Sequence, residues 1–78
     1  LDPADRQRAD ALRVVGAAHD SLGAYPSSDR AYRKAIELLG EIGDRPDRSA
    51  IAAEYAKKLR ARGDVDAAFH YLDLARGR

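Results

Sequence analysis

The two histidines, His19 and His70, are the side chains best suited to acid–base or metal chemistry near neutral pH. Such chemistry needs nearby partners, either a carboxylate and a nucleophile or further ligands at close spacing. The sequence holds no His-Glu-x-x-His motif, no cysteine, no glycine-rich phosphate loop and no nucleophile elbow. His19 lies on an apolar stripe, which favours a packing role, and His70 is predicted at the surface. We therefore expect no enzyme, no metal site and no cofactor.

Basic side chains gather in three clusters that could contact nucleic acid or a carboxylate-rich peptide. They are Arg6 with Arg8, Arg30 with Arg33 and Lys34, and Lys57 with Lys58, Arg60 and Arg62. Acidic residues lie among them, and 14 Lys and Arg residues against 13 Asp and Glu residues leave a formal net charge of +1. This balance provides no overall field that would hold nucleic acid or an anionic membrane. Solvated, salt-bridged faces are therefore favoured over nucleic-acid binding by this segment.

The length of the chain limits it to one small domain. A chain of 78 residues buries a thin core, and without cysteine no disulfide can reinforce that core. The absence of cysteine favours a reducing, cytoplasmic setting. No apolar run approaches the roughly 18 residues that a membrane span requires, and no signal-peptide pattern opens the chain. The start at Leu1-Asp2-Pro3, without a methionine, indicates a segment of a longer protein.

Apolar residues recur at spacings of three and four in four segments, a pattern typical of helices with one buried stripe. The stripes are Leu12, Val15, Gly16, His19 and Leu22; Ala31, Tyr32, Ala35, Ile36, Leu39 and Ile42; Ile51, Ala52, Tyr55, Ala56 and Leu59; and Val65, Ala68, Phe69, Leu72 and Ala75. No alternating pattern predicts a strand. The sequence therefore predicts an all-α fold, with Tyr25 and Tyr71 off the stripes and exposed.

Each predicted helix has start and stop signals. Asp2 and Pro3 suit a cap and a first helical position, and Asp64 suits the cap of the fourth helix. The stops are Gly23, Gly43 and Gly63, and the second helix is expected to be capped by Ser27 or Ser28. The segment Asp44-Arg45-Pro46-Asp47 is expected to be the longest polar break.

The two halves of the chain align with an offset of 40 residues, the separation of Gly23 and Gly63. The offset places Ala56 on Gly16, Ala68 on Ser28, Leu72 on Tyr32 and Ala75 on Ala35. Two helices packed at close range need small residues where their axes approach, and both halves supply them at matching positions. The offset therefore predicts an internal repeat of a helical hairpin.

The second half resembles the tetratricopeptide repeat consensus. The matching pattern is Ala52-x-x-Tyr55-Ala56-x-x-Leu59-x-x-x-Gly63-Asp64-x-x-x-Ala68-x-x-x-Leu72-x-x-Ala75. The first half resembles the same consensus more weakly. Since the standard repeat has about 34 residues, the offset implies about six extra residues between Leu39 and Arg48. The segment from Ile36 to Arg45 looks like the long repeats of bacterial regulatory proteins.

This resemblance implies two hairpins, residues 9–42 and 49–76, stacked as a fragment of a right-handed superhelix whose first helices line a concave face. On that geometry the candidate partner-binding residues are Asp10, Arg13, Asp20, Glu54, Lys57 and Arg60. Arg13, Lys57 and Arg60 would pair with carboxylates on an incoming segment. The family's familiar clamp for a terminal carboxylate uses asparagines, and this chain has none. That binding mode is therefore not carried over.

We expect a protein-interaction module that binds a peptide or partner surface in the groove. Two hairpins are fewer than the roughly three repeats that such folds need, so self-association through an apolar end face is also expected. The alternative is a regulatory segment of a bacterial transcription regulator whose DNA-binding domain lies outside this chain. A third hypothesis, nucleic-acid binding by the cluster from Lys57 to Arg62, ranks last and predicts affinity that falls steeply with salt.

Overall fold

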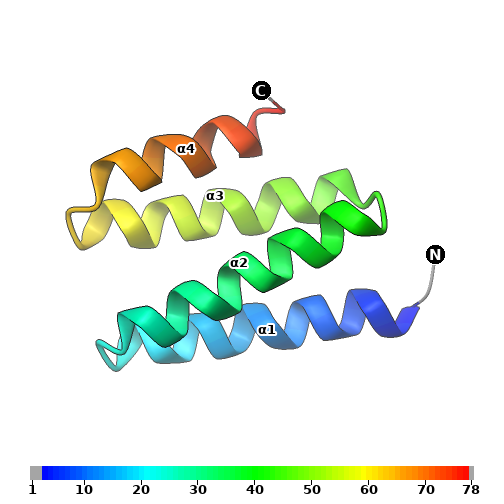
Figure 1. Ribbon diagram of the computed structural model, residues 1–78, viewed down its shortest axis with the longest axis horizontal. Coiled ribbons are helices and arrows are strands. Elements are labelled where there is room, and N and C mark those ends of the chain that lie inside the picture. The colour runs from blue at the N-terminus through cyan, green and yellow to red at the C-terminus, as the bar shows by residue number, and fades with distance from the viewer. Residues whose placement is uncertain (1–2, 78) are drawn as a thin grey trace.

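The chain folds into helices joined by short turns, and the computed structural model describes residues 3–77. The helices are α1 (Pro3–Ser21), α2 (Tyr25–Glu41), α3 (Arg45–Ala61) and α4 (Val65–Ala75). Neighbouring helices run antiparallel (Figure 1). The helices of each hairpin, α1 with α2 and α3 with α4, pack against each other. The described residues contain no strand, and the all-α stack of two hairpins is confirmed.

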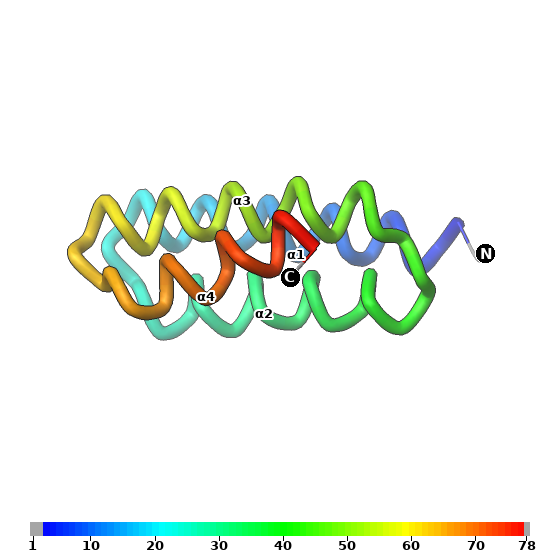
Figure 2. The backbone as a smooth tube through the Cα atoms, turned by 90° about the horizontal axis from the view of Figure 1, so that it is seen from above, coloured from blue at the N-terminus to red at the C-terminus, as the bar shows by residue number. Residues whose placement is uncertain are grey.

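The helices form two layers, α1 with α3 and α2 with α4, as Figure 2 shows. Within the stack α2 contacts both α1 and α3, whereas α1 and α4 lie at its opposite edges (Figure 1). α2 therefore has a neighbouring helix on each side. No helix within residues 3–77 is long and apolar enough to cross a membrane.

All three turns share one geometry. Gly23, Gly43 and Gly63 have φ angles of 76°, 74° and 90°, a left-handed conformation that glycine adopts without steric strain. The residue after each glycine donates its backbone N–H to the carbonyl five residues earlier, at 2.9 Å in every turn. Since the glycines are 20 residues apart, the 40-residue offset corresponds to two helix-and-turn units.

The capping predictions have mixed outcomes. Asp64 caps α4 as predicted, accepting a hydrogen bond of 3.4 Å from the backbone N–H of Ala67. The serine caps are wrong, because α2 begins at Tyr25 after Ala24, which provides no side-chain cap. Ser28 is instead buried and donates to the Gly16 carbonyl at 2.8 Å, where α1 and α2 meet closely. The predicted cap Asp2 lies outside the described residues.

The predicted polar break at residues 44–47 is also wrong. α3 begins at Arg45, with Asp44 as its cap and Pro46 in the first turn, where a missing N–H breaks no helical hydrogen bond. The Asp44 side chain accepts from the backbone N–H of Asp47 at 3.2 Å. The residues between Leu39 and Arg48 thus extend α2 and α3, each of which has 17 residues, and do not form a long loop.

The core lies between α2 and α3. Tyr32 and Leu39 of α2 and Tyr55 and Leu59 of α3 are at most 1% exposed. The Tyr32 and Tyr55 rings stack with centroids 4.9 Å apart and an interplanar angle of 16°. Tyr71, predicted exposed, packs edge-on against Tyr55 at 4.7 Å, so that prediction is wrong. Tyr25 and His70 are exposed as predicted.

Several residues predicted to be buried lie at the surface. They are Val15 (45% exposed) on α1, Leu22 (80%) just after α1, and Val65 (50%) and Phe69 (62%) on α4. Their stripes are wide enough to face two neighbouring helices, yet α1 and α4 each have a neighbour on one side of the stack only. The side of each stripe that faces away from the stack is therefore uncovered.

Candidate partner-binding cleft

A cleft of about 860 Å³ lies between the N-terminal halves of α1 and α3, next to the C-terminal end of α2. Its apolar lining consists of the half-buried Ile42 and of the buried residues Ala9, Leu39 and Ile51. Its polar surface comes from Arg6, Gln7, Asp10, Arg13, Asp47 and Glu54, and Pro3 and Ala50 complete the lining. Helical spacing explains this composition, because residues three and four apart share a face on each of two helices that run the same way (Figure 1).

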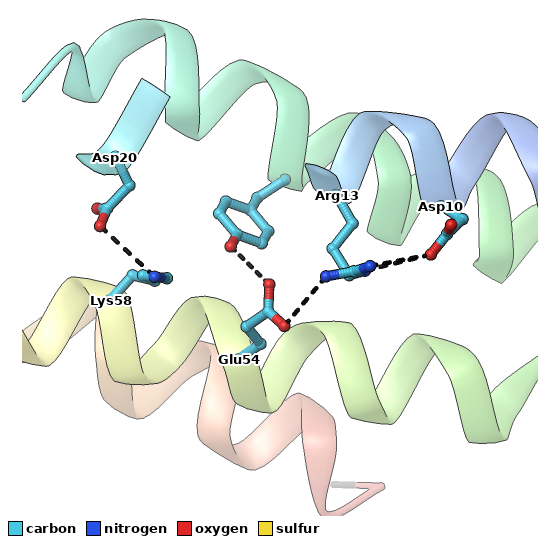
Figure 3. Close-up of polar contacts among 6 residues, drawn as sticks. Asp10, Arg13, Asp20, Glu54 and Lys58 are labelled. Atoms are coloured by element: carbon cyan, nitrogen blue, oxygen red, sulfur yellow. Dashed lines mark hydrogen bonds and ion pairs between the residues drawn. The ribbon is translucent and has the colours of Figure 1, made fainter. Parts of the chain in front are cut away.

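Arg13 links α1 to α3 at this cleft (Figure 3). Its guanidinium donates to Asp10 Oδ1 from Nε at 3.3 Å and from NH2 at 3.2 Å, and its NH1 lies 3.6 Å from Glu54 Oε1. The hydrogen bond to Asp10 raises the pKa of Arg13; burial acts in the opposite direction, and the charge of Glu54 raises it further. Arg13 is therefore a fixed positive charge shared by two carboxylates.

The second oxygen of Glu54 is held by a core tyrosine. The Tyr32 hydroxyl of α2 donates to Glu54 Oε2 at 2.6 Å (Figure 3). Burial raises the pKa of Tyr32, and the hydrogen bond to Glu54 raises it further, so the phenol stays a neutral donor. Glu54 is thus held from α1 through one oxygen and from α2 through the other.

Three further ion pairs lie along the seam between α1 and α3. Arg6 Nε lies 3.0 Å from Asp44 Oδ2 and 3.8 Å from Asp47 Oδ2, which ties α1 to the start of α3. At the other end of the α1–α3 seam, Lys58 Nζ lies 3.8 Å from Asp20 Oδ2 (Figure 3). A row of paired charges therefore runs along the seam.

The structure brings together part of the predicted site. Asp10, Arg13 and Glu54 line the cleft, and Asp20 lies farther along the same seam. Lys57 and Arg60 are exposed on α3 and line no part of the cleft. The sequence prediction missed Arg6 and Asp47, although each lies seven residues, or about two helical turns, before a predicted candidate on the same helix.

The basic cluster from Lys57 to Arg62 is not a continuous cationic surface. Arg62 is 13% exposed in its side chain and bonds Asp29 Oδ1 at 2.7 Å, and Lys58 pairs with Asp20. Asp29 also accepts from the Tyr55 hydroxyl at 2.7 Å, and burial, followed by this bond, raises the pKa of Tyr55. Two of the four basic side chains are therefore neutralised within the fold.

Within residues 3–77, no group of three or more histidine, aspartate or glutamate side chains is placed to hold a metal ion. The cleft combines apolar and charged residues from three helices. Comparison of the chain with protein-family models, with curated protein sequences and with solved structures finds no match. The functional proposal therefore follows from the cleft itself.

Proposed function

We propose that the chain is a protein-interaction module that holds a segment of a partner protein in the cleft between α1 and α3. The observation that carries this proposal is a cleft whose apolar lining, the half-buried Ile42 with the buried Leu39 and Ile51, is set among charged residues of two helices. Interfaces between proteins commonly combine an apolar centre with a polar rim. A large apolar side chain of the partner would be the anchor that fills the centre.

The arrangement of the charges supports a protein partner over a small polar ligand. Arg13 is shared between Asp10 and Glu54, and Arg6 between Asp44 and Asp47. A site for a small polar molecule usually aims a few polar groups at its ligand. Here the charged groups of the cleft pair with one another or with Asp44, so they form a rim of stable shape around an apolar centre.

The remaining sequence candidates extend this proposal beyond the cleft. Lys57 and Arg60 are exposed cations on α3, and Asp20 sits on the seam beside Lys58. A partner segment that continues along α3 would meet the two cations through its carboxylates. Charge reversal at Lys57 should then weaken binding with a salt-dependent loss smaller than the loss caused by filling the cleft.

The resemblance to tetratricopeptide repeats agrees with this function and is itself part of the proposal, as is a cytoplasmic setting. The alternative role, a regulatory segment of a transcription regulator, requires a DNA-binding domain outside this chain. The full-length reading frame would test that alternative directly.

The test is selection of short random peptides on the wild-type chain, followed by calorimetry of the recovered peptides. Ala50→Trp fills the cleft from an exposed position, and Ala61→Trp is the matched control on the same helix outside the cleft. We expect peptides with a large apolar residue to bind the wild type and the control alike, and Ala50→Trp to weaken binding about tenfold or more. Equal binding to all three proteins, or no recovered peptide from a folded chain, would refute the proposal.

A further inference from the structure

Apart from Tyr25 of α2, the large exposed apolar side chains within residues 3–77 gather on the two opposite edges of the stack. Val14 and Val15 of α1 and Leu22 just after α1 are 52%, 45% and 80% exposed, and we call them the head face. Val65 and Phe69 of α4 are 50% and 62% exposed, and with the half-buried Leu72 they make the tail face. Figure 1 shows α1 and α4 on opposite edges, so the two faces of one chain cannot meet each other.

The joint between the two hairpins shows how helices of this stack pack against each other. Beside the contact of Arg33 with Tyr55, four polar contacts cross it from α2 to α3 or to the residue after α3. They are Tyr32 with Glu54 at 2.6 Å, Asp29 with Tyr55 at 2.7 Å, Asp29 with Arg62 at 2.7 Å, and the Tyr25 ring 4.8 Å beneath the Arg62 guanidinium. Every contact pairs a polar or charged group with a specific partner.

Residues 40 apart occupy equivalent places in the two hairpins. Gly23 and Gly63 form the same left-handed turn with the same backbone hydrogen bond, and Gly16 and Ala56 are both buried. The α2 side of the joint, Tyr25, Asp29 and Tyr32, therefore corresponds to Val65, Phe69 and Leu72 on α4. The α3 side, Glu54, Tyr55 and Arg62, corresponds to Val14, Val15 and Leu22 on α1 and just after it.

The tail face thus corresponds to the α2 side of the internal joint and the head face to the α3 side, with apolar residues in place of polar ones. At the equivalent positions, Leu72 and Val14 replace Tyr32 and Glu54, and Phe69 and Val15 replace Asp29 and Tyr55. Likewise, Phe69 and Leu22 replace Asp29 and Arg62, and Val65 and Leu22 replace Tyr25 and Arg62. At each of these four contacts both partners change together from polar to apolar, whereas Arg33 with Tyr55 corresponds to Asp73 with Val15. Exposure to water alone would not require apolar residues at the six positions that make the four pairs.

We propose that the tail face of one copy of this chain docks on the head face of a second copy and repeats the internal joint between them. The interface is heterologous, so each copy keeps one free face and association continues to longer stacks or closes into a ring. α4 has 11 residues against 17 in α2, so the joint between copies is shorter than the internal one. We therefore expect reversible, concentration-dependent stacking.

This inference does not rest on the cleft, since none of the residues of the head and tail faces lines it. Failure of the peptide selection would leave stacking untouched. Failure of stacking would leave the cleft untouched.

The experiment is analytical ultracentrifugation of the 78-residue chain over a wide concentration range, with single charges placed on each face. Val15→Glu blocks the head face, Phe69→Glu blocks the tail face, and Ala61→Glu adds the same charge on α3, outside the cleft and both faces. We expect the average mass of the wild type and of Ala61→Glu to rise beyond two chains with concentration. Each face variant alone should stay at the 8.5 kDa of one chain.

The decisive arm is an equal mixture of Val15→Glu and Phe69→Glu. One intact tail face meets one intact head face, so the mixture should form dimers and nothing larger. A wild type that stays monomeric at every concentration would overturn the proposal and assign the faces to a different partner. Association of either face variant alone would overturn it too, because that result requires like faces to pair. Circular dichroism checks folding, and if a variant loses its helical spectrum, Val15→Ser and Phe69→Ser take its place.

Discussion

The second helices of the two hairpins, α2 and α4, hold equivalent positions and differ sharply in burial. α2 buries Ser28, Ala31, Tyr32, Ala35, Ile36 and Leu39, whereas the only buried residue of α4 is Ala68. α2 has a helix on each side, and within the described chain α4 packs against α3 from one side. The difference shows that an apolar stripe in this stack is buried only where a neighbouring helix covers it.

The two hairpins also divide their core volume differently. In the first hairpin, a Cβ atom at Gly16 would lie 2.8 Å from Tyr32 Cδ2, so the absence of a side chain makes room for the ring. In the second hairpin the equivalent pair is Ala56 and Leu72. The smaller Gly16 opposite the larger Tyr32 and the larger Ala56 opposite the smaller Leu72 therefore fill similar spaces.

The largest expected effect comes from truncating the equivalent core residues. Tyr32→Ala should lower the free energy of unfolding by about 3–5 kcal/mol, because the ring is fully buried and its loss leaves a cavity. Leu72→Ala should cost only about 1–2 kcal/mol, since that side chain is partly exposed. Urea unfolding followed by circular dichroism at low protein concentration measures both. Equal costs would show that α4 is covered as completely as α2.

A smaller effect on stability is expected at Gly16, the position where the two hairpins differ in how side chains fill the space between their helices. Gly16→Ala should cost about 1–3 kcal/mol, because the added methyl meets the buried Tyr32 ring. The double variant Gly16→Ala, Tyr32→Leu has the same pair of residue types as Ala56 and Leu72 in the second hairpin. In the Tyr32→Leu background, Gly16→Ala should therefore leave the free energy of unfolding unchanged or raise it. Gly40→Ala is the control for helix propensity: position 40 is exposed, the nearest atom belongs to the flexible Arg48 side chain, and a gain of up to about 1 kcal/mol is expected. An equal penalty for Gly16→Ala in both backgrounds would contradict the role given to the Tyr32 ring.

The smallest effect distinguishes the turns inside the two hairpins. Asp64 caps α4, and Ala24 leaves α2 without a side-chain cap. Asp64→Ala should lower the free energy of unfolding by about 0.5–1 kcal/mol, and Ala24→Asp should raise it by a similar amount by providing an acceptor for the first backbone N–H groups. Thermal unfolding of the two variants beside the wild type measures the difference. A loss of stability in Ala24→Asp would show that the first turn has no room for a cap.

The helices and turns could be predicted from the sequence because their signals are local. Spacings of three and four located all four helices, and glycine positions located the three turns. The start of α3 was predicted too late, because aspartate and proline, here Asp44 and Pro46, are typical both of polar loops and of the first positions of a helix. The cap predicted at Ser27 or Ser28 was wrong, whereas the close contact expected between the small residues Gly16 and Ser28 is confirmed.

The candidate site could be predicted only in part. Asp10, Arg13 and Glu54 were found from the expected position of the first helices, and all three line the cleft. The hydroxyl of Tyr32 was assigned to the core and not to Glu54, since a ring can be fully buried while its oxygen reaches a half-exposed carboxylate. Lys58, which was not a candidate, pairs with Asp20, whereas the candidate Lys57 is exposed; this difference of one residue depends on how α3 is rotated against α1.

By itself the sequence determined the all-α class, the turns at the three glycines and the 40-residue repeat, because backbone conformation and apolar periodicity act over a few residues. Tertiary structure alone decided which side of each stripe is covered, which charges pair across the seam and which apolar residues remain at the edges. Those outcomes depend on distances between helices, and a residue such as Phe69 is core or surface according to whether another helix lies against it.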